Sequence, residues 1–177
     1  MAKAIILAWL ALLVHTNSHC QSAGDLACVE KTYLSQVGVR EATGRNDGKA
    51  VAQYLRTCGL GTGYSWCAAF VNYCLTSCDF KTNNNAWAAA WFPDQKIIWT
   101  PTKPIGQPRT GDCVGFRFGK SQRISHIGFV HEWGRKSVVT VEGNTNMAGS
   151  REGDGVYCRR RPIGVIAAVS RWTGGVR

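Results

Sequence analysis

A cysteine in surroundings that favour a reactive thiol stands at position 67. It follows the glycine-rich stretch 59–64 (GLGTGY) and begins the segment 67–76 (CAAFVNYCLT), which is apolar on nearly every turn and which we expect to be a buried helix. At the first turn of a helix, unpaired backbone N–H groups and the positive end of the dipole favour a thiolate. Most lone cysteines are small buried hydrophobes, so Cys67 needs a base beside it to act as a nucleophile.

The candidate base is His126, which begins an expected strand that turns back through Trp133–Arg135 into a second one. If this hairpin is centred on Gly134, His126 lies directly opposite Glu142, with Cβ atoms about 5 Å apart on one face. A carboxylate beside an imidazole fixes its tautomer and stabilises the imidazolium. Asn144 has the same parity and could supply a second polar contact. A one-residue slip would send Glu142 to the other face, and a surface His–Glu pair is the simpler alternative.

The elements that must position these groups come in the order helices first, strands later. Between them, residues 81–110 hold four of the five prolines and form a long irregular connection. Helices followed by an antiparallel sheet define an α+β domain, here N-terminal helices packed on a sheet of about five to six strands. The expected helices are 26–37, 47–57 and 67–76, and the expected strands are 113–118, 126–132, 137–142, 155–159 and 164–171.

The N-terminus has the pattern of a secretory signal peptide. Lys3 precedes the apolar run 4–14, whose eleven residues are too few to span a bilayer as a helix, which needs about 20. We therefore expect residues 1–22 to be a signal peptide and residues 23–177 to be a single catalytic domain, secreted or periplasmic and without a membrane span. A lipid anchor at Cys20 is less favoured, because His19 is bulky where lipoprotein signals carry a small residue.

Composition and net charge indicate in which compartment the protein works and what kind of partner it binds. The chain has 177 residues and a net charge of +10, which favours an anionic partner. Eight cysteines are many for a cytosolic protein of this size and indicate an oxidising compartment. If the first two helices pack antiparallel, Cys28 and Cys58 come close together, and we expect a disulfide between them.

Four short blocks, in this order and spacing, resemble the CHAP domain. CHAP proteins are cysteine, histidine-dependent amidohydrolases and peptidases, related to the NlpC-type cell-wall peptidases and built on a papain-like α+β fold. The resemblance covers about residues 26 to 172. The blocks are residues 63–75 (GYSWCAAFVNYCL), 111–116 (GDCVGF), 125–130 (SHIGFV) and 141–144 (VEGN).

The resemblance implies a role for each candidate residue. Cys67 corresponds to the nucleophile, His126 to the general base, and Glu142 and Asn144 to the groups that orient the histidine. The family hydrolyses amide bonds of peptidoglycan, either the N-acetylmuramoyl-L-alanine bond or a peptide bond of the stem or cross-bridge. It implies no metal and no cofactor. The expected partner is peptidoglycan or its fragments, and we expect a monomer.

Aromatic residues near the candidate site are candidates for substrate contacts. They are Tyr64, Trp66, Trp87 and Trp91. Each of them could equally be a core aromatic, which is the commoner role of such side chains.

Three other functions compete with hydrolysis. A metal site is disfavoured because Cys74 and Cys78 are four apart and lack a second ligand pair. Nucleic-acid binding would use the run Arg159–Arg161, but basic residues are otherwise scattered, and such a run is more often a solvated strand end. A catalytically silent cell-wall-binding protein on the same fold is the strongest alternative, although the presence of Cys67, His126 and Glu142 together disfavours it.

Overall fold

The three α-helices precede the strands along the chain. The computed structural model describes residues 17–118, 122–148 and 153–174. Most of the predicted signal peptide, residues 1–22, lies outside the described residues, and it stays a prediction. The first helix begins at Asn17, earlier than expected. The helices are α1 (Asn17–Ser35), α2 (Lys49–Arg56) and α3 (Cys67–Thr76).

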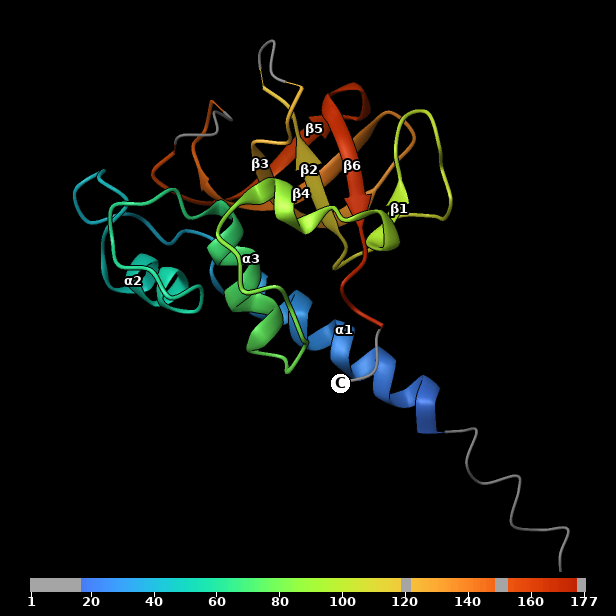
Figure 1. The fold of residues 1–177 in the computed structure, drawn as a ribbon, viewed down its shortest axis with the longest axis horizontal. Helices are drawn as coiled ribbons and strands as arrows, with labels where there is room; N and C mark the ends of the chain where they lie inside the picture. Colours follow the sequence, from blue (N-terminus) through green and yellow to red (C-terminus); the bar gives the residue numbers. More distant parts are fainter. Residues whose placement is uncertain (1–16, 119–121, 149–152, 175–177) are drawn as a thin grey trace, which may run out of the picture.

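Six antiparallel strands form one sheet in the order β1-β6-β2-β3-β4-β5. The helices lie on one side of it in Figure 1, and α3 packs against β3 and β4. The predicted α+β architecture is confirmed. The strands are β1 (Ile97–Trp99), β2 (Cys113–Phe116), β3 (His126–Trp133), β4 (Ser137–Thr145), β5 (Gly155–Pro162) and β6 (Ile166–Ser170).

The connection 81–110 is more ordered than the sequence predicted. It contains two short 3₁₀ helices, η1 (Ala88–Trp91) and η2 (Asp94–Lys96), and the edge strand β1, which pairs with β6. A strand of three residues is too short to show the alternation by which strands are identified. A third 3₁₀ helix, η3 (Ile163–Val165), precedes β6.

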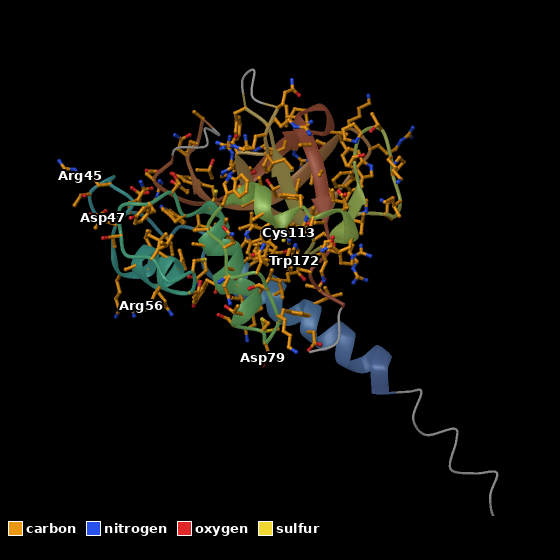
Figure 2. All side chains as sticks on the ribbon, in the orientation of Figure 1. Arg45, Asp47, Arg56, Asp79, Cys113 and Trp172 are labelled. Atoms are coloured by element: carbon orange, nitrogen blue, oxygen red, sulfur yellow. A yellow bond between two sulfur atoms is a disulfide. The ribbon has the colours of Figure 1, made fainter. Side chains whose placement is uncertain are left out.

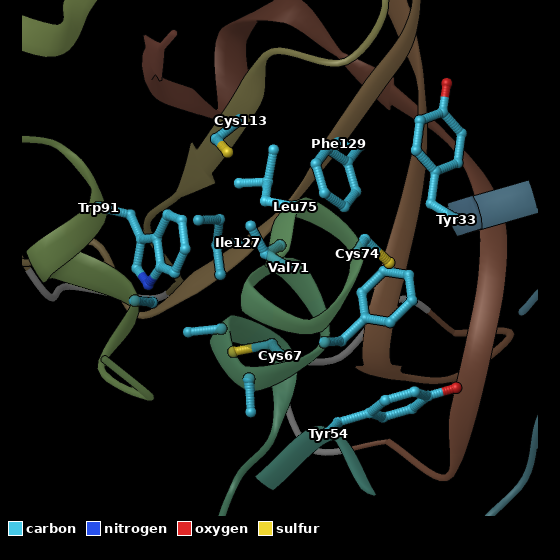
Figure 3. Packing of buried hydrophobic residues seen from close by; sticks show 14 of the residues in the cluster. Tyr33, Tyr54, Cys67, Val71, Cys74, Leu75, Trp91, Cys113, Ile127 and Phe129 are labelled. Carbon is cyan, nitrogen blue, oxygen red and sulfur yellow. The ribbon is translucent and has the colours of Figure 1, made fainter. Parts of the chain in front are cut away.

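Helix α3 is the centre of the core. Eight of its ten residues are buried, as its apolar sequence predicted. Val71 and Leu75 lie toward Ile127 and Phe129 of β3 (Figure 3). On the strand side, a Cβ at Gly143 would come within 2.8 Å of Phe70, so a glycine is required for the helix to approach β4 this closely.

The layer between helices and sheet is mostly apolar, and most charged side chains point outward, although Asp112, Glu142 and Arg161 are buried. Cys113 and Trp172 lie inside, whereas Arg45 and Arg56 lie at the periphery (Figure 2). Within the described part of the chain, no helix has the length and apolar character needed to cross a membrane.

The disulfide differs from the expected one. Cys28 of α1 is bonded to Cys78, just after α3, and Cys58 is free. The prediction of a Cys28–Cys58 bond was wrong because it placed α1 beside α2, whereas α1 packs on α3. Thr32, one turn after Cys28, also contacts the Cys78 sulfur. The disulfide therefore fastens the first helix to the helix that carries Cys67.

Breaking this disulfide is expected to lower the free energy of unfolding by about 4 kcal/mol, the chain-entropy value for a loop of this size. The bond joins residues 50 apart in the sequence, so its loss frees a long loop in the unfolded chain. Urea unfolding of the Cys78→Ser variant measures the effect, and Cys158→Ser, which removes an exposed free thiol, is the control. Equal midpoints for Cys78→Ser and wild type would show that the bond does not stabilise the fold.

Candidate functional site

Cys67 is the first residue of α3 and is 5% exposed. Trp66 stands at the N-cap position without a side-chain cap, and the first helical hydrogen bond runs from the Phe70 N–H to the Trp66 carbonyl (2.8 Å). The backbone N–H groups of residues 67–69 are thus the unpaired donors expected at a helix start. The structure places the thiol where the sequence predicted it, at the positive end of a buried helix (Figure 3).

His126 and Glu142 form a buried pair. His126 Nε2 lies 2.9 Å from Glu142 Oε2, and both side chains are fully buried. Nε2 donates to the carboxylate, and Nδ1 is buried without a hydrogen-bond partner among the described residues, so Nδ1 is the ring nitrogen left for the Cys67 thiol. Burial lowers the pKa of His126, but the neighbouring Cys67 and Glu142 side chains raise it, and the pKa lies at about 9. The three side chains from α3, β3 and β4 are therefore brought together.

The strand register differs from the one expected. The hairpin pairs Phe129 with Val141, so continuing the pairing sets Gly128, and not His126, opposite Glu142. The shift is two residues, which keeps Glu142 on the face of His126 because side chains alternate along a strand. The turn is centred beyond Gly134, with Trp133 opposite Val138, which moves the pairing by three residues from the expected one. The irregularity between Val130 and Glu132 then takes back one of the three.

Gly128 explains how Glu142 reaches the imidazole from this diagonal position. A Cβ at Gly128 would lie 2.6 Å from Glu142 Cγ and 2.7 Å from the Val141 carbonyl. The carboxylate side chain therefore crosses the space that a larger residue would fill. The SHIGFV block thus carries both the histidine and the gap that admits its partner.

Arg161 belongs to this cluster but was not among the site residues predicted from the sequence. The run Arg159–Arg161 was predicted to be a solvated strand end, and this was wrong for Arg161, which is 8% exposed. Its Nε donates to Glu142 Oε1 at 2.8 Å and its terminal nitrogen donates to Oε2. Arg160, one residue away on β5, is exposed. The alternation of a strand carries this signal, but only the pairing of β5 with β4 reveals which arginine points inward.

The Glu142 carboxylate is consequently held in its charged form. Thr140 Oγ1 also donates to Oε1, at 2.6 Å. Burial raises the pKa of Glu142, but the hydrogen bonds from Arg161 and His126 outweigh it and lower the pKa to about 2. The site therefore holds a fixed negative charge at one end of the histidine.

Asn144 does not contact the histidine in the way expected. It has φ 54° in an irregular part of β4, beyond the pairing of Glu142 with Tyr157. In the amide orientation that satisfies both groups, its oxygen accepts from the Trp66 N–H (3.1 Å) and its nitrogen donates to the Gly153 carbonyl (2.9 Å). Asn144 thus holds the residue before Cys67, because the irregular backbone turns its amide toward the helix start.

Two of the four aromatic candidates are core residues. Trp66 and Trp91 are fully buried, with their indole N–H groups bonded to Glu41 and to the Asn85 carbonyl, so they are not exposed for substrate contacts. Tyr64 and Trp87 are 57% and 54% exposed. The Arg123 guanidinium lies 5.9 Å from the Trp87 ring centre.

Within the described residues, no group of three or more His, Cys, Asp or Glu side chains is arranged to hold a metal ion.

Comparison with known proteins agrees with the resemblance seen in the sequence. Residues 59–144 match the CHAP domain family. No curated protein matches this chain. The family match and the architecture confirm the expected CHAP resemblance and its papain-like fold.

Solved structures share the fold at low sequence identity. The P60 domain of an antigen from M. avium paratuberculosis is 16% identical over 86% of this chain and 96% of that one, with a TM-score of 0.51. A mutated form of the Resuscitation Promoting Factor Interacting protein RipA is 14% identical over 88% of this chain, with a TM-score of 0.50. This chain spans 65% of the RipA structure.

Proposed function

Because residues 59–144 match the CHAP domain family, we propose that this chain is a peptidoglycan hydrolase that cleaves an amide bond with Cys67 as its nucleophile. The observation that carries the proposal is the buried line of groups from α3 to β4: Cys67 at the helix start, His126 beside it, and Glu142 2.9 Å from the far nitrogen of the ring. A nucleophile, a base and a group that orients the base are the three parts that covalent acyl transfer requires.

The raised pKa of His126 determines where the proton rests. At a pKa of about 9, the imidazole is protonated at neutral pH, and Glu142 is its counter-charge. In the proposed reaction the Cys67 thiolate attacks the scissile carbonyl carbon, and the carbonyl π electrons move onto its oxygen. The Cys67 backbone N–H at the helix start is the donor best placed to stabilise that oxyanion.

The second half of the reaction returns the enzyme to its starting state. His126 donates its proton to the leaving amine as the C–N bond breaks, which leaves a thioester on Cys67 and a neutral imidazole. The imidazole then takes a proton from water, the hydroxide attacks the thioester, and the Cys67 thiolate leaves with the protonated histidine beside it. No metal ion or cofactor is needed to balance these steps.

Substrate recognition is proposed to use the exposed aromatic residues. Tyr64 lies three residues before Cys67, and Trp87 precedes η1, which packs against α3. Their exposed rings can cover the apolar faces of sugar rings or stem side chains. The net charge of +10 favours an anionic cell envelope as the partner. The bond cleaved is either the N-acetylmuramoyl-L-alanine amide or a peptide bond of the stem or cross-bridge.

Digestion of purified peptidoglycan, with mass analysis of the products, tests the proposal. The wild-type chain is expected to release new amine termini: L-alanine for an amidase, or a residue within the stem or bridge for an endopeptidase. Cys67→Ala is expected to release none, whereas Cys158→Ser, which removes an exposed thiol, is expected to match wild type. Binding of wild type to peptidoglycan without any product would instead support the catalytically silent wall-binding protein.

A further inference from the structure

Arg161 continues the line of catalytic groups beyond Glu142. Its guanidinium contacts both oxygens of the carboxylate whose Oε2 also accepts from His126. Two parallel N–H donors on one carboxylate fix its plane as well as its charge. The imidazole, the carboxylate and the guanidinium thus form one chain of hydrogen bonds across β3, β4 and β5.

Two phenylalanine rings lie against both ends of this chain. The Arg161 guanidinium lies 5.2 Å from the Phe116 ring centre and 5.9 Å from that of Phe118. Both rings also lie 5.8 Å from the His126 ring. The aromatic contacts keep water from the ion pairs, and charges act more strongly on one another where water is excluded.

The charges around Glu142 show why His126 alone is not enough to keep this carboxylate charged during the reaction. Glu142 is faced by His126 from β3 and by Arg161 from β5, while Thr140 on its own strand is neutral; Cys67 of α3 faces His126. In the proposed reaction His126 loses its proton to the leaving amine. Among the described side chains, Arg161 is then the cation that still bonds this buried carboxylate, and a buried carboxylate without a cation is strongly disfavoured.

We infer that Arg161 is a positioning residue of this centre, which keeps Glu142 charged and fixed while His126 gives up and regains its proton. This inference rests on the proposed function, in which His126 transfers protons. Arg161 acts through Glu142 and does not touch the reacting atoms. The lysine variant is not equivalent, because an ammonium group cannot bond both carboxylate oxygens in one plane.

The pH dependence of Cys67 alkylation by iodoacetamide tests the inference on the full chain, with site-resolved mass spectrometry to follow Cys67. For Arg161→Gln we expect the acid limb of the rate to move up by about one pH unit or more. Without the guanidinium, Glu142 is protonated at a higher pH and no longer stabilises the imidazolium that accompanies the thiolate. For Arg161→Lys, which keeps the charge, the acid limb is expected to lie at a pH between those of Arg161→Gln and wild type.

Arg160→Gln is the matched control, since it removes the same charge from an exposed neighbour on β5, and its profile is expected to coincide with wild type. A purely structural role would lower the Arg161→Gln rate at every pH and leave the limb in place, and this would overturn the inference. The inference would also be overturned if the pH profile of Arg161→Lys were displaced as far as that of Arg161→Gln. If Arg161→Gln does not fold, the lysine profile decides, and its coincidence with wild type would overturn the inference.

Failure of this inference is distinguishable from failure of the proposed function. Alkylation needs no peptidoglycan, so a shifted profile in a chain that releases no product contradicts the hydrolase proposal alone. An unshifted profile in a chain that does release product contradicts the role of Arg161 alone.

Discussion

Cys67→Ala is expected to lower the rate of peptidoglycan hydrolysis at least about 10⁴-fold, the scale on which removing a nucleophile acts in enzymes that form an acyl intermediate. The loss follows from the geometry, because the thiol is the group that faces the free nitrogen of a histidine already bonded to Glu142. The rate is measured from released amine termini. The variant is expected to stay folded, because it removes one sulfur from a helix that is packed on all sides.

The same prediction extends to the pair of residues. Cys67 and His126 act as one unit, so the double variant Cys67→Ala/His126→Ala is expected to be no slower than Cys67→Ala alone. Rates of the two single variants and the double variant are compared under one set of conditions. Losses that multiply in the double variant would mean that the two groups act independently, which the proposed mechanism does not allow.

Glu142→Gln is expected to lower the free energy of unfolding near pH 7 by about 3–5 kcal/mol, because it removes a buried negative charge that is bonded to both Arg161 and His126. The effect depends on pH. Burial raises the pKa of Glu142, but Arg161 and His126 lower it to about 2 from an ordinary 4.5. A depressed pKa contributes stability above the unfolded value, and this contribution is lost as the pH falls from about 4.5 to about 2.

The difference in the free energy of unfolding between wild type and Glu142→Gln is therefore expected to depend on pH. Urea unfolding from pH 6 to pH 2 is expected to show it shrinking by about 3 kcal/mol below pH 4.5, the free energy that corresponds to the pKa shift. Asp154→Asn, which removes an exposed ion pair with Arg40, is the control and is expected to run parallel to wild type. A difference that stays constant with pH would show that Glu142 is not held as a carboxylate.

The contribution of His126 to stability depends on pH in the opposite direction. Burial lowers its pKa and the contacts with Cys67 and Glu142 raise it to about 9 from an ordinary 6.5. A raised pKa contributes stability that is complete below 6.5 and is lost as the pH rises through 9. The buried pair is therefore most stabilising between about pH 4.5 and 6.5, the interval in which both charges are present in the folded and the unfolded chain.

The local sequence was sufficient to predict the elements that carry the chemistry. The apolar run behind Cys67 predicted a buried helix, and the strand pair predicted that His126 and Glu142 share a face. The second prediction survived an error of two residues in register, because parity and not exact opposition decides the face. Gly128 then supplies the room that a diagonal pair requires.

Contacts between distant segments could not be predicted from local patterns. Arg161 reaches Glu142 only through the pairing of β5 with β4, and a run of arginines is indistinguishable in sequence from a solvated strand end. The pairing of Cys28 with Cys78 depends on α1 packing against α3. Asn144 faces Trp66 because of an irregular backbone, which residue types do not show.

The most direct test of the central claim measures how the digestion of peptidoglycan by the wild-type chain changes as Cys67 is progressively alkylated. Site-resolved mass spectrometry gives the fraction of Cys67 modified, alongside that of the two free thiols that are not buried, Cys58 and Cys158. If Cys67 is the nucleophile, the rate falls in proportion to that fraction and reaches zero when every Cys67 is blocked. A rate that persists with Cys67 fully alkylated would contradict the account.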